Sequence, residues 1–242
     1  MSVDVASQVT AAYPLSSLLV IEGSTTAGSV ALFSGGALVT VCSVPMGAGR
    51  EDHLFPAVQR LLAEARVSVH PLAGVVCGAG PGSFTSLRIA ASLAKGIAHG
   101  ASLPLFAVPS LLLAAADASE TLPAGPVVVH ADALRGERYV LDVTVGVHGE
   151  VSAASSLRRM SMDHLDIHAA GLPRLAVLGS PSPSGEYRVV TPSAAHLGRV
   201  ALSAWAEAVP LDQWEPQYGR LAEAQVKWEA SHGALLPVDG GA

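Results

Sequence analysis

Three glycines, a proline and three hydroxyl side chains meet in the stretch CGAGPGSFTSLR, residues 77–88, a combination that can bind phosphate. Glycines let backbone amides approach an anion, and the helix that follows begins with further free amides. Two familiar phosphate motifs do not fit, because a P-loop needs Lys where Gly82 stands and the dinucleotide fingerprint needs a third glycine where Ser83 stands. Two interpretations stay open: a tight turn with Ser83 as helix cap, or a phosphate or nucleotide loop made of Gly78, Gly80, Gly82, Ser83 and Thr85.

Two acidic residues at the ends of apolar runs form a second candidate for chemistry. Glu22 closes SLLVIE and Asp132 closes GPVVVHAD, and each run is followed by a turn and a further apolar run. Paired carboxylates at strand ends are suitable ligands for magnesium. An active phosphotransferase or ATPase that uses Glu22 and Asp132 across a cleft between two lobes is therefore one candidate function. Against it, the second half carries no further glycine-rich loop and no basic clamp.

Two histidines raise the possibility of a metallopeptidase. His164 and His168 lie one helical turn apart in HLDIH and could share a metal ion. The HExxH pattern, whose glutamate would supply a general base, is missing. The sequence therefore favours surface histidines over a metal site.

Composition excludes several classes of protein. Half of the 242 residues are apolar, which is enough to bury a sizeable core. A net charge of -6 and an aromatic content of 5% argue against a surface that binds RNA on its own. Cys42 and Cys77 lie in apolar runs without a CxxC pair, which favours reduced core thiols and a cytoplasmic protein. Residues 1–15 have neither a basic start nor a long apolar stretch, so we interpret them as a flexible extension rather than a signal peptide.

The elements that must position these residues alternate between strands and helices in the first half. Strands are predicted at residues 17–22, 29–34, 37–44, 72–78 and 103–109. Helices are predicted at residues 54–65, behind Asp52 as cap, and at 84–100 and 110–118. This order argues for a three-layer α/β lobe with a partly parallel sheet.

The second half repeats the opening arrangement, and after this repeat fewer helices and strands are predicted. GPVVVHADALRGERYVLDVTVGV again gives a strand, an acid, a turn and a strand, and a helix near 161–169, a strand at 174–180 and a helix over 193–209 follow. We expect a first lobe at 16–122, a linker near 123–126, a reduced second lobe at 126–210 and a tail at 211–242. The tail is polar, carries two tryptophans and is expected to fold back over the body.

The helix predicted at 84–100 has three distinct faces. Small residues form one stripe: Ser86, Ala90, Ala94 and Ala98. Larger apolar residues form the next: Ile89, Leu93 and Ile97. A polar and basic face carries Arg88, Ser92, Lys95 and His99. The small stripe would let another helix approach closely, although packing within the same chain is the more common reason for such a stripe.

Several segments, in order, resemble one protein family. GAGPGSFTSLRIAASLAKGIAHG resembles the signature GxGPGSFTGLRIGxxxAKGLA of the bacterial tRNA threonylcarbamoyladenosine biosynthesis family TsaB, also called YeaZ. LLVIEGSTTAGSVAL, LFPAVQRLLAEA, DALRGERYV and EPQYGRLAEAQ resemble the family's opening, first helix, second-lobe turn and tail. The resemblance extends from Leu18 to about Glu229.

The resemblance implies an α/β fold of the actin, hexokinase and Hsp70 type (ASKHA), with two ribonuclease-H-like lobes of which the second is reduced. It implies a non-catalytic subunit that binds the catalytic paralogue TsaD and, with the ATPase TsaE, supports transfer of a threonylcarbamoyl group to a tRNA adenosine. Such a subunit would reach tRNA only through the complex. No cofactor is expected in the chain itself, and ATP or ADP at the interface of the complex is left open.

Partner contacts are carried over to the first-lobe helices by position. The residues concerned are Phe55, Leu62, Arg88, Ala91 and Lys95. When the chain is alone, a homodimer through the same helices is a plausible alternative.

The chain departs from the family pattern at five positions: Glu22 for Asp, Gly23 for Thr, Ser86 for Gly, Leu134 for Arg and Gly219 for Leu. In phosphotransferases of this superfold the first-strand acid helps to hold a metal-bound phosphate. The longer side chain at Glu22 leads us to expect that Glu22 and Asp132 are vestigial acids.

Overall fold

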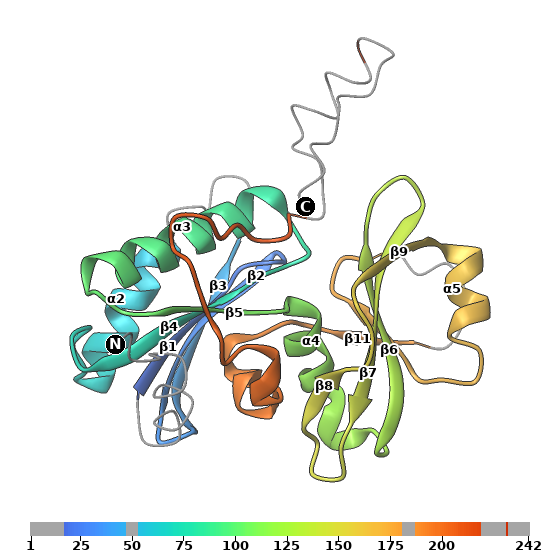
Figure 1. The fold of residues 1–242 in the computed structure, drawn as a ribbon, viewed down its shortest axis with the longest axis horizontal. Helices are drawn as coiled ribbons and strands as arrows, with labels where there is room; N and C mark the ends of the chain where they lie inside the picture. Colours follow the sequence, from blue (N-terminus) through green and yellow to red (C-terminus); the bar gives the residue numbers. More distant parts are fainter. Residues whose placement is uncertain (1–16, 47–52, 181–186, 219–230, 232–242) are drawn as a thin grey trace, which may run out of the picture.

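The computed structural model describes residues 17–46, 53–180, 187–218 and 231. It contains two sheets with an α-helical layer between them and helices on both outer faces (Figure 1). The predicted extension at 1–15, Asp52 as a helix cap, and the tail from Gly219 onwards apart from Ser231 lie outside the described residues. Among the described helices, none has the length and hydrophobicity that crossing a membrane requires.

The first sheet has the strand order β12-β5-β4-β1-β2-β3. Its strands are β1 (Ser17–Glu22), β2 (Ala27–Ser34), β3 (Ala37–Pro45), β4 (Leu72–Gly78), β5 (Leu105–Val108) and β12 (Ala208–Val209). β1, β2 and β3 form the predicted antiparallel meander, while β4 and β5 are added in parallel beside β1. The crossovers contain α2 (Leu54–Ala65) and α3 (Phe84–Gly100), which cover one face of the sheet.

The second sheet repeats this plan in smaller form, with the order β11-β10-β6-β7-β8. Its strands are β6 (Gly125–Asp132), β7 (Glu137–Val145), β8 (Val151–Ala153), β9 (Arg158–Ser161), β10 (Arg174–Val177) and β11 (Arg188–Val190). β7 runs antiparallel to β6 and also pairs with β9, and β10 and β11 are added in parallel. α5 (Met162–His168) covers the outer face.

A shared apolar core joins the two lobes. α4 (Ser110–Ala118) lies between the sheets and is buried at every position except Asp117. Its side chains pack against residues from both sheets in one continuous cluster. Two further clusters fill the space under α2 and α3 and under α5. The lobes are therefore held together by buried apolar area as well as by their linkers.

The predicted helix over residues 193–209 is wrong. The chain forms two short 3₁₀ segments, η3 (Ala194–Arg199) and η4 (Leu202–Ala204), and then β12. The break between them has a tertiary cause, since the Ala201 amide donates to the Val151 carbonyl at the edge of the second sheet and Trp205 is buried. Helical composition is overridden where the backbone pairs with another element.

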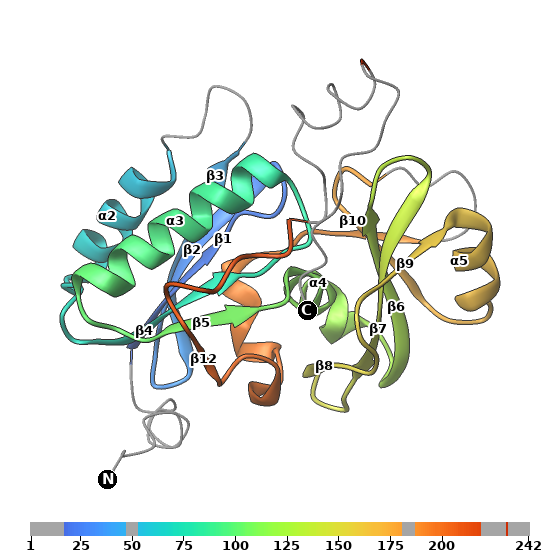
Figure 2. The same ribbon diagram turned by 45° about the horizontal axis from the view of Figure 1, so that its top comes forward.

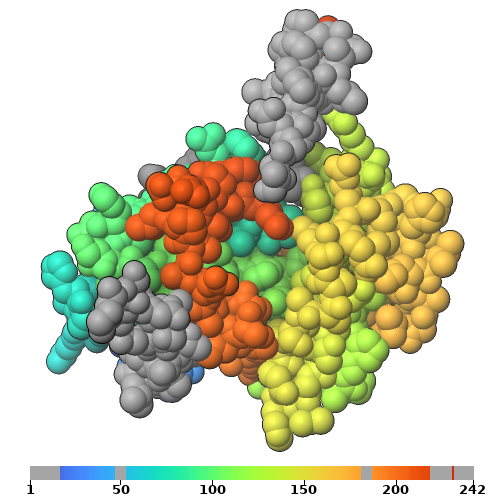
Figure 3. Space-filling model, viewed as in Figure 1, coloured from blue at the N-terminus to red at the C-terminus, as the bar shows by residue number. Residues whose placement is uncertain are grey.

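The chain returns to the first lobe after β11. η3 lies against β1, β2 and β3, and β12 pairs antiparallel with β5, so residues 208–209 belong to the first sheet and not to the second lobe in which we had predicted them. Residues 208–218, which we call the strap, then run along α3 (Figure 2). Figure 3 shows the strap on the outside of the first lobe. The proposed limits of the lobes otherwise stay a prediction.

Candidate functional site

Glu22 stands at the end of β1 with its carboxylate completely buried. Oε1 accepts a hydrogen bond from the Ser24 amide at 2.5 Å, and Oε2 accepts one from the Ser110 hydroxyl at 2.8 Å. The same Ser110 oxygen accepts from the Gly80 amide at 3.0 Å. Burial raises the pKa of Glu22 above its usual value, and the bonds from Ser24 and Ser110 oppose this shift. Glu22 thus joins β1, the glycine loop and the start of α4.

The glycine loop is packed against the protein's own atoms. A Cβ on Gly78 would lie 1.9 Å from Glu22 Oε2, and one on Gly82 would lie 2.1 Å from the Ser24 carbonyl oxygen. Gly80 has a φ of +83°, and a Cβ there would lie 2.4 Å from the Gln217 carbonyl oxygen. Close approach of the chain to itself therefore accounts for all three glycines without a ligand.

The start of α3 only partly matches the expectation that Ser83 caps this helix. Ser83 is the N-cap residue, but its side chain makes no capping bond; its amide donates to the Ser24 carbonyl at 2.8 Å, and its hydroxyl contacts that of Ser86. Thr85 is exposed in the first turn. A phosphate or nucleotide role for this loop stays a prediction.

Asp132 occupies the matching position at the end of β6 and is bound within its own lobe. Its Oδ1 accepts from the Leu134 amide at 3.2 Å and from Arg138 Nη1 at 3.1 Å. Leu134, one of the departures from the family pattern, has a φ of 64° in the turn that follows. The two acids are therefore anchored separately, each by neighbours near its own strand end.

His168 contacts an acidic side chain of β7. His168 Nε2 lies 2.7 Å from Asp142 Oδ1, and Arg158 bonds the other carboxylate oxygen. His164 is exposed on α5. Within the described ranges, no group of three His, Cys, Asp or Glu side chains is placed to hold a metal ion.

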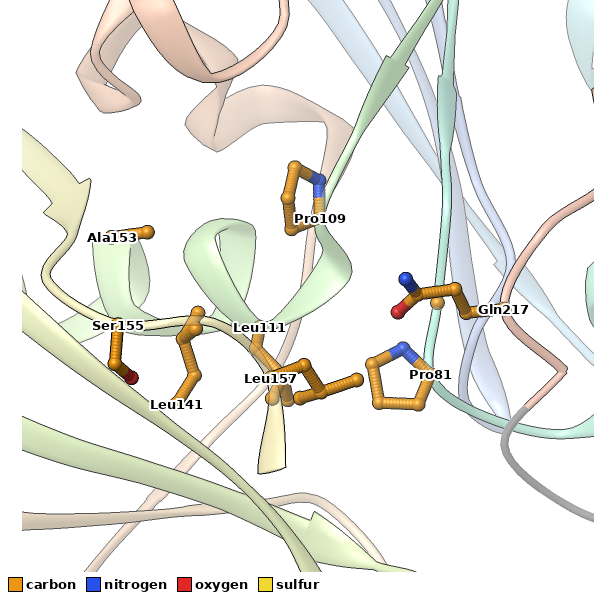
Figure 4. Close-up of a pocket in the computed structure, with 9 residues that line it drawn as sticks. Pro81, Pro109, Leu111, Leu141, Ala153, Ser155, Leu157 and Gln217 are labelled. Carbon is orange, nitrogen blue, oxygen red and sulfur yellow. The ribbon is translucent and has the colours of Figure 1, made fainter. Parts of the chain in front are cut away.

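A small pocket of about 170 Å³ lies between the lobes (Figure 4). Apolar groups from both lobes make most of its wall, with Pro81 and Leu111 from the first lobe side and Leu141 and Leu157 from the second. Gln217 of the strap lies beside Pro81. None of the lining residues is charged, and the polar side chains among them are Ser155 and Gln217.

The cysteines differ in their surroundings. Cys77 is free and fully buried in β4, as predicted for a core thiol, and burial raises its pKa. Cys42 is also free but only partly buried on the edge strand β3, so its prediction as a core residue is wrong. Its sulfur accepts a hydrogen bond from Arg60 of α2 at 2.7 Å.

The predicted partner-contact residues are divided between surface and core. Phe55 is 52% exposed, Arg88 is exposed, and the Lys95 side chain is 22% exposed. Leu62 and Ala91 are only 7% and 3% exposed, so neither side chain is available at the surface. The partner surface itself stays a prediction.

The small-residue stripe of α3 is internal. Its members Ser86, Ala90, Ala94 and Ala98 are all buried. A Cβ on Gly23 would lie 2.9 Å from the Ala90 Cβ, which shows how closely α3 approaches the end of β1. The stripe therefore serves packing within the lobe.

Sequence reasoning missed the strap residues that contact α3. The Tyr218 ring lies 4.7 Å from that of Phe84, and Glu215 forms an ion pair with Lys95 at 3.0 Å. Trp214 lies beside the same ammonium group, 5.8 Å from its ring centroid. The EPQY segment within the tail was the one signal that could have pointed to these contacts.

Comparison with known proteins relates this chain to one family. A family model described as TsaD, tRNA N6-adenosine threonylcarbamoyltransferase, matches residues 44–155. Proteins named tRNA threonylcarbamoyladenosine biosynthesis protein TsaB are 32% identical in Haemophilus influenzae and 36% identical in Escherichia coli, over 52% and 50% of this chain. The chain spans about half the length of these two relatives, 53% and 52%.

A solved structure extends the similarity to the whole fold. YeaZ from Pseudomonas aeruginosa superposes with a TM-score of 0.71 at 28% identity, covering 84% of this chain and 100% of that one. The chain belongs to the TsaB/YeaZ family. The ASKHA-type α/β fold expected from the resemblance is confirmed, with its two sheets. This TsaB/YeaZ member retains the strand-end acids at Glu22 and Asp132, but both are bound within the protein.

Proposed function

We propose that this protein is a non-catalytic accessory subunit of the machinery that makes threonylcarbamoyladenosine in tRNA. In this role it binds a TsaD-type catalytic paralogue in the cytoplasm, together with a TsaE-type ATPase. The names of its TsaB relatives support the pathway. A net charge of -6 supports contact with tRNA through the complex rather than by this chain alone.

The burial and the hydrogen bonds of the Glu22 carboxylate are the main support for a non-catalytic role. The first-strand acid of phosphotransferases with this superfold must face a metal-bound phosphate. Here both carboxylate oxygens accept hydrogen bonds from the chain, and the side chain is completely buried. Gly78 lies so close that a methyl group could not fit beside the carboxylate. Such an acid supports the loop structure and does not reach a substrate.

The outer surface of α2 and α3 supports partner binding. The two helices lie side by side on the first sheet (Figure 1), with Phe55 exposed on α2. On α3, the apolar stripe Ile89, Leu93 and Ile97 is only partly buried. Apolar side chains left partly open along helices are typical of surfaces that bind another protein, whether the catalytic paralogue or a second copy. Any ATP or ADP is proposed to bind at the interface of the complex.

An active ASKHA-type phosphotransferase or ATPase is the alternative, and the observation that favours it is an acid at the corresponding strand end of each sheet, Glu22 on β1 and Asp132 on β6. It requires Glu22 to leave its buried position. A metallopeptidase would require a different partner for His168, which is bound to Asp142.

Reconstitution tests the proposal directly. Unmodified tRNA, threonylcarbamoyl-adenylate, ATP, and TsaD and TsaE from the same source are incubated with and without this protein, and modified nucleoside is measured. We expect modification only when the protein is added, and none from the protein alone. Equal modification in both mixtures would contradict the accessory role. ATP hydrolysis by the isolated protein that Glu22→Gln abolishes would establish the alternative.

A further inference from the structure

The pocket between the two lobes has an apolar floor and a polar, uncharged rim. Leu111 and Leu141 are 1% and 4% exposed and Pro81 is also buried, so these side chains form the floor. Ala153 and Gln217 are exposed and form the rim, where the pocket meets solvent. A ligand that enters at the rim therefore places its apolar part between the lobes and keeps a polar edge at the opening.

The walls of this pocket are held in place by contacts within the protein. On the strap side, the Gln217 amide donates to the Ala79 carbonyl at 2.8 Å, and the Gln217 carbonyl lies against Gly80. On the other side, Leu111 and Leu141 belong to the apolar cluster that joins the two sheets. The pocket is thus formed without a ligand, and a molecule that binds there does not have to separate the lobes.

The two polar side chains of the pocket differ in what they can offer a ligand. The Ser155 hydroxyl accepts from the Asp142 amide at 3.2 Å and donates to the Ser156 carbonyl at 3.1 Å, so its donor is already used. Figure 4 shows the Gln217 carboxamide turned toward the pocket, beside Pro81. Among the hydrogen bonds of the described residues, none involves this carboxamide. It can therefore supply an acceptor and two donors to a ligand at the rim.

Volume and charge define the class of ligand. The pocket, at about 170 Å³, is close in size to an apolar cavity of roughly 150 Å³ that holds benzene, so one aromatic ring fits. Because no lining residue is charged, an ionised group would lose water without gaining a counter-ion. We propose that this pocket binds a small uncharged aromatic molecule, with its ring on the apolar floor and an amide-like edge paired with Gln217. This inference goes beyond the proposed function and does not depend on it.

Benzamide and benzoate, which have the same shape but differ in charge, test the class of ligand. Their binding to the full-length chain is followed by NMR of the leucine methyl groups. Leu111, Leu141 and Leu157 line the pocket, and Leu165, buried beneath α5, is the internal control. We expect benzamide to shift the three pocket leucines with a Kd on the order of 1 mM and to leave Leu165 unchanged. Benzoate should bind at least about fivefold more weakly.

Three variants locate the bound probe. Ala153→Leu narrows the opening and should abolish the benzamide shifts, whereas Ala154→Leu, at the next exposed position and outside the lining, should leave them unchanged. Gln217→Leu should weaken benzamide binding about fivefold, because it removes the polar contact at the rim. The same variant should bind toluene, which lacks the amide, at least as tightly as wild type does.

Other results would overturn the inference. If benzoate binds as tightly as benzamide, the pocket accepts an anion and the ligand class is wrong. If Ala153→Leu binds benzamide as wild type does, the probe occupies another place. If Gln217→Leu has wild-type affinity for benzamide, Gln217 does not recognise the polar edge. If benzamide at about tenfold the expected Kd leaves the pocket leucines unshifted, the pocket does not bind an aromatic ring.

Discussion

The Ser110 hydroxyl donates a hydrogen bond of 2.8 Å to Glu22 Oε2, although the two residues are 88 positions apart in the chain. Ser110 opens the buried helix α4, and Glu22 ends the central strand β1. Because the Gly80 amide donates to the same hydroxyl oxygen, one buried side chain connects strand, loop and helix. Several predictions about stability depend on this connection or on similar buried polar contacts.

Ser110→Ala should destabilise the protein by about 1–3 kcal/mol, because it leaves a buried carboxylate oxygen and the Gly80 amide without their partner. Urea unfolding measures the change. Ser92→Ala is the control, since Ser92 is exposed on α3 and should change the free energy of unfolding by less than about 0.5 kcal/mol. Equal effects of the two variants would contradict the role given to Ser110.

Glu22→Gln should change how stability depends on pH. Burial raises the Glu22 pKa, so the folded protein keeps its proton at pH values where the unfolded chain has lost it. The stability that Glu22 contributes is complete below its unfolded pKa of about 4.5 and is lost as the pH rises through the folded pKa. The free energy of unfolding of Glu22→Gln minus that of wild type should therefore increase from pH 4.5 upwards. A difference that is constant with pH would contradict the raised pKa.

The same variant also tests function. If Glu22 does no phosphoryl chemistry, Glu22→Gln should support tRNA modification within about threefold of wild type in the reconstituted mixture, provided that the folded fraction is equal. A folded variant that still binds its partner but has lost this activity would revive the enzymatic alternative.

Alanine at the loop glycines should be severely destabilising. In Gly82→Ala the new methyl group would meet a backbone carbonyl at 2.1 Å, so the loop or β1 must move, and we expect a loss of about 3 kcal/mol or more. Gly96→Ala is the matched variant, because no atom of another described residue is found within 4 Å of its Cβ position on α3. There the helix should gain about 0.5–1 kcal/mol. Thermal melts of both variants measure the contrast, and a tolerated Gly82→Ala would refute the packed loop.

His130 should make the protein acid-sensitive. It is 1% exposed on β6, and burial, with Arg138 and Arg174 nearby, lowers its pKa to about 4. Since the unfolded chain binds the proton near pH 6.5 and the folded protein does not, stability is lost as the pH falls from 6.5 towards 4, by about 3 kcal/mol at most. His130→Leu should remove this part of the dependence of stability on pH. It should cost little at pH 7, because Nδ1 has no hydrogen-bond partner among the residues that the structure describes.

Chelation and histidine replacement test the histidine pair. With His168 bound to Asp142, a chelator should leave the melting temperature unchanged. His168→Gln should cost about 1 kcal/mol, whereas His164→Gln, at an exposed position, should cost almost nothing. A marked drop in melting temperature with chelator, or equal losses in the two variants, would indicate a shared metal ion.

Local periodicity was sufficient to predict much of the first lobe. The apolar and small stripes predicted α3 with the bounds that the structure shows, because they report a helix packed on a sheet. The repeated strand, acid and turn predicted the duplication of the two sheets. Leu62 and Ala91 were predicted from the family pattern to contact a partner. Both lie on the expected helices, but their side chains are buried.

Features set by tertiary contacts could not be predicted in the same way. The strand β12 has only two residues and exists because β5 offers an unpaired edge. The role of Glu22 depends on Ser110 and on the closeness of Gly78, both far away in sequence. The segment around Trp205 has a helical composition, but its backbone is bound to the second sheet instead.

The late return of the chain to the first lobe has a consequence for synthesis. The Ala194 amide donates to Ser29 Oγ at 2.8 Å, a bond that spans 165 positions, and β12 closes the edge of the first sheet later still. A ribosome that has just completed α4 has therefore made most of the first lobe but not all of it. Until the second lobe has emerged, β5 keeps an open edge, and the cluster beneath α3 lacks Val209, Leu211 and Trp214. The nascent chain passes through a stage in which these surfaces are accessible to other proteins.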